Sequence, residues 1–202
     1  MKKLQDIENR VLNRIYGYGR GNCFTPDRFL DLGSDEAIRK GLSRLETKGT
    51  IRRVCKGVYE YPKLHKELGV LPTNIKRFID AISLRDNIQV QPSGAFAANL
   101  LGLSEQVPAL IVYLTDGRDK NLKIGKRTIK FKRTSNKAMA VAGTTSGLVF
   151  EALKFIGKDN LSEQMISKIR KKLTEKDKAK LLIDMKFAPI WMHKILRSLV
   201  ET

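Results

Sequence analysis

Apolar residues in the first third of the chain recur at helical spacing and then change to strand-like runs. Between residues 4 and 15 the leucines, isoleucines and valine fall three and four positions apart, which predicts a first helix. A short second helix is expected next, with Thr25 as its N-cap, Pro26 at its first position and Phe29 on its apolar side. Gly33 is expected to end it.

The next apolar pattern predicts a third helix followed by a hairpin. Ser34 is placed to cap this helix, and Ile38, Leu42 and Leu45 give it one buried face. Strand-forming residues 50–55 and 58–61 flank a Lys-Gly pair that is typical of a turn. Helices followed by a hairpin in this order are typical of the winged helix-turn-helix, which presents one helix to a DNA major groove.

The opposite face of the third predicted helix carries cations and hydroxyls three and four residues apart, and more cations lie on the hairpin. Taken alone, a basic helix face is most simply a solvated surface. The hairpin next to it favours DNA binding instead, because helix, hairpin and charge occur together. The residues expected at DNA are Thr25, Arg28, Ser34, Arg39, Lys40, Ser43, Arg44, Lys48, Arg52, Arg53 and Lys56.

The remaining pattern predicts a second, mixed domain. Strands are expected at 88–91 and 109–114, a hairpin turning at Gly125-Lys126, a helix that residues 142–147 open and that runs to about 156, and three helices in the last forty residues. The predicted fold class is therefore α+β: an N-terminal winged helix-turn-helix, then a mixed α/β domain with a small sheet and a helical C-terminal tail. We expect domains at 1–62 and 73–202, joined by a connector at 63–72.

The net charge of the chain indicates a polyanionic partner. The 202 residues hold 39 Lys or Arg and 21 Asp or Glu, a net charge of +18. Residues 118–137 contain nine basic side chains and one acidic. A strand kept soluble by lysine and a nucleic-acid or partner surface both explain this segment. Its candidate residues are Lys123, Lys126, Arg127, Lys130, Lys132 and Arg133.

Several classes of function are disfavoured by the sequence. No run approaches the about 18 apolar residues that a membrane helix needs, and the first residues lack a signal peptide's apolar segment, so we expect a cytoplasmic protein. Two cysteines and two histidines form no metal-binding pattern. Ser93 has no histidine nearby in the sequence, and no other catalytic constellation is visible. We therefore expect no enzyme activity, cofactor or metal.

Residues 92–117, PSGAFAANLLGLSEQVPALIVYLTDG, carry a recognisable signature. Its matching parts are Pro92-Ser93-Gly94, Ala98-Asn99, Leu101-Gly102-Leu103, Gln106-Val107-Pro108 and Tyr113 to Gly117. With the preceding helix and hairpin, the chain over about residues 1–155 resembles the AbiEi-type antitoxins, transcriptional regulators of bacterial type IV toxin-antitoxin systems.

The resemblance implies a repressor that binds an inverted repeat in the promoter of its own operon. It also implies that the C-terminal domain counters a nucleotidyltransferase-like toxin, with or without stable contact. An alternative from another class stays open: an RNA-binding protein that uses the basic second domain, since residues 63–202 hold 26 basic and 13 acidic side chains.

Overall fold

The computed structural model describes residues 2–106 and 108–201, and the side chains from residue 6 onward within those ranges. Val107, part of the 92–117 signature, lies outside the described residues. The chain is a mixed α/β protein with several small sheets, and it divides into two compact units, Met1–Asn87 and Ile88–Thr202. Each unit is described by itself below.

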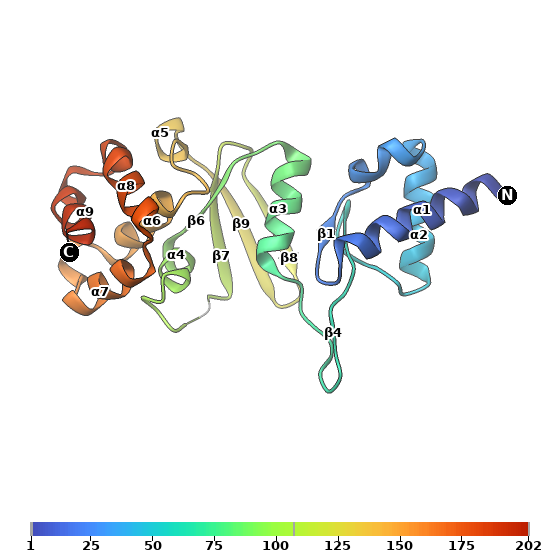
Figure 1. The fold of residues 1–202 in the computed structure, drawn as a ribbon, viewed down its shortest axis with the longest axis horizontal. Coiled ribbons are helices and arrows are strands. Elements are labelled where there is room, and N and C mark those ends of the chain that lie inside the picture. The colour runs from blue at the N-terminus through green and yellow to red at the C-terminus, as the bar shows by residue number, and fades with distance from the viewer. Residues whose placement is uncertain (1, 107, 202) are drawn as a thin grey trace. The chain divides into compact units, whose positions relative to one another are not determined.

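The first unit combines helices with a three-stranded antiparallel sheet (Figure 1). Its helices are α1 (Lys2–Tyr18), the 3-10 helix η1 (Pro26–Leu32), α2 (Asp35–Thr47) and α3 (Ile75–Asp86). The sheet contains β1 (Cys23–Phe24), β2 (Arg52–Cys55) and β3 (Val58–Glu60) in the order β1-β3-β2. A separate hairpin pairs β4 (Leu64–His65) with β5 (Gly69–Val70).

Local signals set most element ends in this unit. The Ser34 hydroxyl accepts a hydrogen bond from the backbone N–H of Ala37 at 3.4 Å, which caps α2 as expected. Gly49 follows α2 with φ +71°, and Gly57 turns the β2–β3 hairpin with φ +74°. Thr25 occupies the N-cap position of η1 but makes no capping bond with its side chain. The segment after it is 3-10 rather than α-helical.

The core of the first unit lies between α1, η1, α2 and the sheet. Phe24 and Phe29 meet edge to face, with ring centroids 5.5 Å apart at 86°. The buried residues of this cluster are Val11, Ile15, Phe24, Phe29, Ile38, Leu42, Leu45, Ile51 and Tyr59. The apolar positions that the sequence assigned to three helices therefore share one core.

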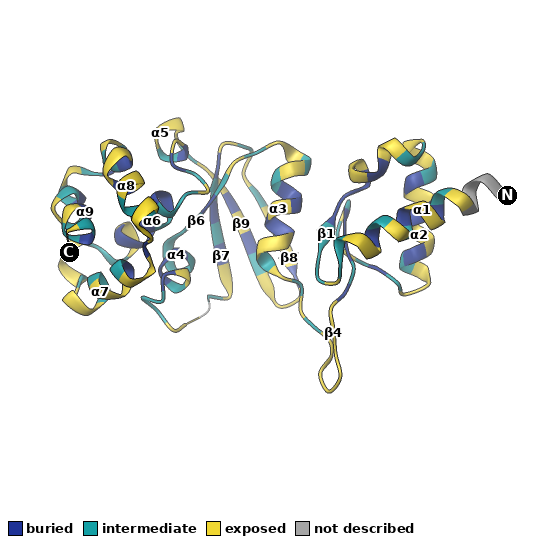
Figure 2. Cartoon of the chain, viewed as in Figure 1, coloured by how far each residue is buried: buried dark blue, intermediate teal, exposed yellow. Residues whose placement is uncertain are grey.

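The first unit extends further along the chain than the expected domain 1–62. Residues 63–70, expected to be a connector, form the β4–β5 hairpin and are exposed throughout (Figure 2). Helix α3 lies within the range expected for the second domain, 73–202, but it packs on β1 and β3 of the first unit. Its N-cap is Asn74, whose side chain accepts from the N–H of Arg77 at 3.1 Å.

The second unit contains a four-stranded sheet and helices. The strands are β6 (Val90–Ser93), β7 (Leu110–Thr115), β8 (Lys120–Ile124) and β9 (Arg127–Arg133), in the order β6-β7-β9-β8. Only β7 and β9 pair in parallel; the other two pairings are antiparallel. The expected hairpin is confirmed, since Gly125 turns between β8 and β9 with φ +56°. Ile129 and Phe131 are buried, whereas Lys130 and Lys132 are exposed, as the alternating pattern predicts.

The helices of the second unit are α4 (Gly94–Leu100), α5 (Asn136–Met139), α6 (Thr145–Ile156), α7 (Glu163–Lys172), α8 (Glu175–Asp184) and α9 (His193–Val200). Three 3-10 turns join them: η2 (Lys158–Asn160), η3 (Met185–Phe187) and η4 (Ile190–Met192). Buried residues of α4 and α6 to α9 form one core cluster. No helix among the described residues is long and apolar enough to cross a membrane.

Residues of the 92–117 signature hold this unit together. The Ser93 hydroxyl donates to the Glu151 carboxylate at 2.7 Å. The Asn99 amide donates to the carbonyls of Ser104 at 3.0 Å and Gln106 at 3.2 Å. Gly102 takes φ +73°, a conformation that favours glycine. Each of these signature residues therefore has a structural role.

Candidate nucleic-acid interface

The exposed face of α2 carries two cations that are paired only with neighbours on the same helix. Arg39 Nε lies 2.7 Å from the Asp35 carboxylate, and Lys40 Nζ lies 2.7 Å from that of Glu36. The side chains of Arg39 and Lys40 are 60% and 58% exposed. Exposed pairs of this kind contribute at most about 1 kcal/mol, so both cations are available to phosphates. Ser43, one turn further along, is exposed as well.

The other two cations of α2 are tied to α1. Glu8 of α1 has a side chain only 8% exposed, and its carboxylate forms ion pairs with Lys48 and, at 3.6 Å, with Arg44 Nη1. The cations remain about half exposed while the carboxylate is buried. The cationic face of α2 is therefore partly neutralised by Glu8, which lies 40 positions before Lys48 in the sequence.

Arg53 joins the hairpin to α2. Its Nε lies 3.8 Å from the Glu46 carboxylate of α2, and its Nη2 donates to the Tyr59 hydroxyl at 2.7 Å. The side chain stays 49% exposed. Lys56 is exposed at the hairpin turn, and its carbonyl accepts from Arg85 Nη1 at 3.0 Å. The Arg53–Glu46 ion pair thus links the hairpin to α2.

Two residues of the sequence-based set are corrected by the structure. Thr25 is 1% exposed and cannot reach a groove. Arg52 donates to the buried Glu60 carboxylate at 2.6 Å and to the Leu71 carbonyl at 2.8 Å, so it anchors the chain after the hairpin. Alternation along β2 separates Arg52 from Arg53. Arg28 and Ser34 are exposed.

We define the α2–hairpin surface as the exposed members of that set that lie on α2, at its N-cap or on the β2–β3 hairpin; Arg28 of η1 is not part of it. They are Ser34, Arg39, Lys40, Ser43, Arg44, Lys48, Arg53 and Lys56.

The second unit carries a separate cationic surface on its sheet. Six exposed cations of β8, β9 and their turn make it up, and none of them forms an ion pair with any described residue. Lys123, Lys130 and Lys132 are on the face of the sheet opposite Ile129 and Phe131, whereas Arg127 and Arg133, at the two ends of β9, are in phase with those buried residues. Lys130 lies opposite Asn121, and Lys123 opposite Thr128, across the two strands. We call this set the β8–β9 surface: Lys123, Lys126, Arg127, Lys130, Lys132 and Arg133.

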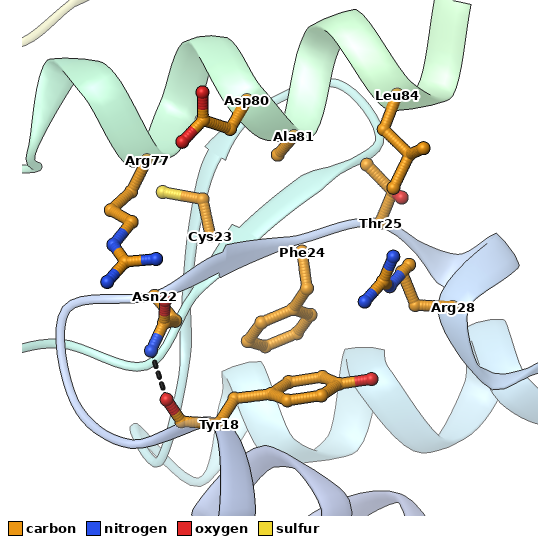
Figure 3. A pocket seen from close by; sticks show the side chains of 10 residues that line it. All are labelled: Tyr18, Asn22, Cys23, Phe24, Thr25, Arg28, Arg77, Asp80, Ala81 and Leu84. Atoms are coloured by element: carbon orange, nitrogen blue, oxygen red, sulfur yellow. Dashed lines mark hydrogen bonds between the residues drawn. The ribbon is translucent and has the colours of Figure 1, made fainter. Parts of the chain in front are cut away.

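A cleft that the sequence did not indicate lies in the first unit. Ten residues from α1, β1, η1, α3 and the adjoining loop line a volume of about 370 Å³ (Figure 3). Cys23 is among them, and burial, followed by the negative charge of Glu60, raises the pKa of its thiol to about 12. The lining residues are spread along the sequence from Tyr18 to Leu84, so no local sequence motif predicts the cleft. No group of three or more potential metal ligands gathers among the described residues.

Fold and surface together define a two-unit α/β protein with cationic faces on both units. The chain belongs to a family of unknown function, DUF6088, which matches residues 10–181. A comparison with curated proteins found no match.

Proposed function

We propose that this protein is a DNA-binding transcriptional repressor whose first unit is a winged helix-turn-helix. The order α1-β1-η1-α2-β2-β3 and the sheet order β1-β3-β2 support this interpretation, with α2 as the recognition helix and the β2–β3 hairpin as the wing. The observation that carries the proposal is the α2–hairpin surface, in which Arg53 of the wing lies 3.8 Å from Glu46 of the helix.

The charges of this surface lie on two elements that a DNA duplex could contact, α2 and the β2–β3 hairpin. Arg39, Lys40 and Ser43 lie on the outward side of α2, where long cationic and hydroxyl side chains can contact base edges and phosphates. Arg53 and Lys56 lie on the hairpin, where a wing would contact the sugar-phosphate backbone of DNA. Asp35 and Glu36 at the start of α2 form exposed ion pairs with Arg39 and Lys40. DNA phosphates can replace these carboxylates as the partners of the two cations.

We further propose that the protein is the antitoxin of a type IV system and counters a nucleotidyltransferase-like toxin. The resemblance of residues 92–117 to AbiEi-type antitoxins supports this part. The roles of Ser93 and Asn99 in holding the second unit together agree with a signature that specifies a fold rather than a reaction. Co-expression with the product of the adjacent gene tests it: rescue of growth is expected, and growth arrest despite soluble antitoxin would exclude the antitoxin role.

Fluorescence anisotropy with the protein's own promoter fragment tests DNA binding. Arg39→Gln and Lys40→Gln together should weaken binding by about tenfold or more, because each lost phosphate contact lowers the salt slope by about 0.9. Arg10→Gln is the charge control, since Arg10 is exposed on α1. The assignment of the α2 face is refuted if the double variant and the control bind alike.

RNA binding is a second candidate, because the six cations of the β8–β9 surface have no ion-pair partner among the described residues. Titrating tRNA and promoter DNA at one salt concentration separates the two functions. A triple variant, Lys123→Gln with Lys130→Gln and Lys132→Gln, should then lower RNA affinity and leave promoter affinity within about twofold. Preference for tRNA over the promoter, lost in this triple variant, would replace DNA with RNA as the main partner.

A further inference from the structure

One side of the β8–β9 strand pair combines lysines with neutral polar side chains. Lys130 is paired with Asn121 and Lys123 with Thr128 across the two strands, and residues paired in this way point to the same side of a sheet. Lys132 follows two positions after Lys130 and therefore shares that side. We call these five residues the lysine face.

Helices cover this side of the sheet only at its other edge. Ser93 of β6 donates a hydrogen bond to the Glu151 carboxylate of α6 at 2.7 Å. Ser93 is in register with Val112 of β7, and Val112 is in register with Lys130, so α6 packs on the side that carries the lysine face. All members of the lysine face except the half-buried Thr128 are exposed, because no helix of the described second unit reaches β8 and β9 on this side.

The side chains of the lysine face have no partners within the described part of the chain. None of the five forms an ion pair or a side-chain hydrogen bond there. Three neighbouring ammonium groups repel one another, so a ligand with several negative charges is favoured. The Thr128 hydroxyl and the Asn121 amide can each donate and accept a hydrogen bond. The matching ligand therefore has anionic groups with neutral hydroxyl groups between them.

Two forms of nucleic acid fit this face poorly. Single strands bind largely by stacking their bases on aromatic rings, but Phe131, the one aromatic residue of the described strands β8 and β9, is buried on the opposite side. The major groove of B-form DNA admits a helix or a two-stranded ribbon. Since β9 also pairs with β7, β8 and β9 are part of a wider sheet and not a separate ribbon.

We propose that the lysine face binds double-stranded RNA. The minor groove of A-form RNA is wide and shallow and displays 2′-hydroxyls beside the phosphates. A sheet face can lie across such a groove, with Lys123, Lys130 and Lys132 at phosphates and Asn121 and Thr128 at 2′-hydroxyls. This inference rests on the RNA-binding candidate function and specifies its ligand.

Fluorescence anisotropy of the full-length protein at one salt concentration tests the ligand. The probes are an RNA duplex of about 20 base pairs, one of its strands alone, and a DNA duplex of the same sequence, unrelated to the promoter. The RNA duplex should bind about fivefold or more tightly than either of the other two.

A charge variant and a matched control test the position of the site. Replacing the three lysines of the lysine face by glutamine should weaken binding of the RNA duplex about tenfold or more and lower the salt slope by about 2 to 3. The control removes three exposed charges elsewhere in the second unit and should change the affinity by about twofold at most. It combines Lys158→Gln, Lys168→Gln and Lys171→Gln.

A neutral variant tests recognition of the 2′-hydroxyls. Asn121→Ala with Thr128→Val keeps every charge, so the salt slope should not change. The preference for the RNA duplex over the DNA duplex should fall to about twofold or less, because the hydrogen-bonding groups between the lysines are lost. Circular dichroism checks that each variant is folded.

The outcomes separate this inference from the candidate function on which it rests. Tighter binding of the single strand, or equal binding of the RNA and DNA duplexes, would overturn the inference and leave RNA binding in place. Equal losses in the charge variant and its control would mean diffuse attraction to a chain of net charge +18 and would also overturn it. Absence of binding to either RNA probe would overturn both the inference and the RNA-binding candidate, whereas promoter binding is measured independently.

Discussion

Replacing Glu8 by glutamine should lower stability and raise DNA affinity at the same time. Glu8 is a buried carboxylate of α1 that pairs with Arg44 and Lys48 of α2. Glutamine keeps the shape and an acceptor oxygen but removes the charge. The two cations, about half exposed, are then released to solvent or to DNA phosphates.

The size of both effects follows from the exposure of the partners. Removing one member of a fully buried pair costs about 3–5 kcal/mol, because the other charge is left buried. Here Arg44 and Lys48 can hydrate, so we expect the free energy of unfolding to fall by about 1–2 kcal/mol. One additional phosphate contact steepens the salt slope by about 0.9, which amounts to about five- to tenfold tighter binding at roughly 0.1 M salt.

Urea unfolding followed by circular dichroism measures the first effect, and promoter anisotropy at several salt concentrations measures the second. Asp6→Asn is the matched control: it removes one negative charge from an exposed position of α1 that has no ion-pair partner in the described residues. Its stability and salt slope should stay close to those of the wild type. Promoter affinity that is unchanged or weaker in folded Glu8→Gln would show that Arg44 and Lys48 are not at the DNA, and unchanged stability would show that the ion pairs contribute nothing.

Two further predictions concern Gly147 and Asp177 of the second unit. Gly147→Ala should lower the free energy of unfolding by about 3 kcal/mol, because its Cβ would lie 2.4 Å from the Val141 carbonyl oxygen. Gly17→Ala of α1 is the control: its Cβ would have no atom within 4 Å, so stability should be unchanged or raised by up to about 1 kcal/mol. Equal losses of the two variants in urea unfolding would contradict the close packing at Gly147. The hydrogen bond from Thr174 lowers the pKa of Asp177 from its ordinary 3.8, so the stabilisation is present above that value and is lost as pH falls through the lowered folded-state pKa. Asp177→Asn should therefore cost about 1 kcal/mol at pH 7 and progressively less below 3.8, and a pH-independent loss would rule out the charged cap.

Much of the local structure was predictable because its causes lie within a few residues. Ser34 caps α2 through a neighbour three positions away, and Gly57 turns the hairpin by its own backbone conformation. The alternation of Ile129 and Phe131 with lysines predicted which side of β9 is buried. The unit boundary was not predictable in this way, because α3 belongs to the first unit through contacts with β1 and β3, strands more than ten residues earlier.

The candidate site likewise has features that the sequence predicts and features that it does not. Sequence spacing alone determined that cations gather on one helix face, on the adjoining hairpin and on a later strand pair, because helical and strand periodicity are local properties. Only the tertiary structure decided which of these charges are available: Arg52 is bound to Glu60 and Leu71, and Lys48 is bound to a carboxylate 40 residues away. The cleft around Arg28 and Arg77 likewise exists only after folding, since it needs residues from both ends of the first unit. Periodicity places a side chain on a face, but the partner it meets there depends on long-range packing.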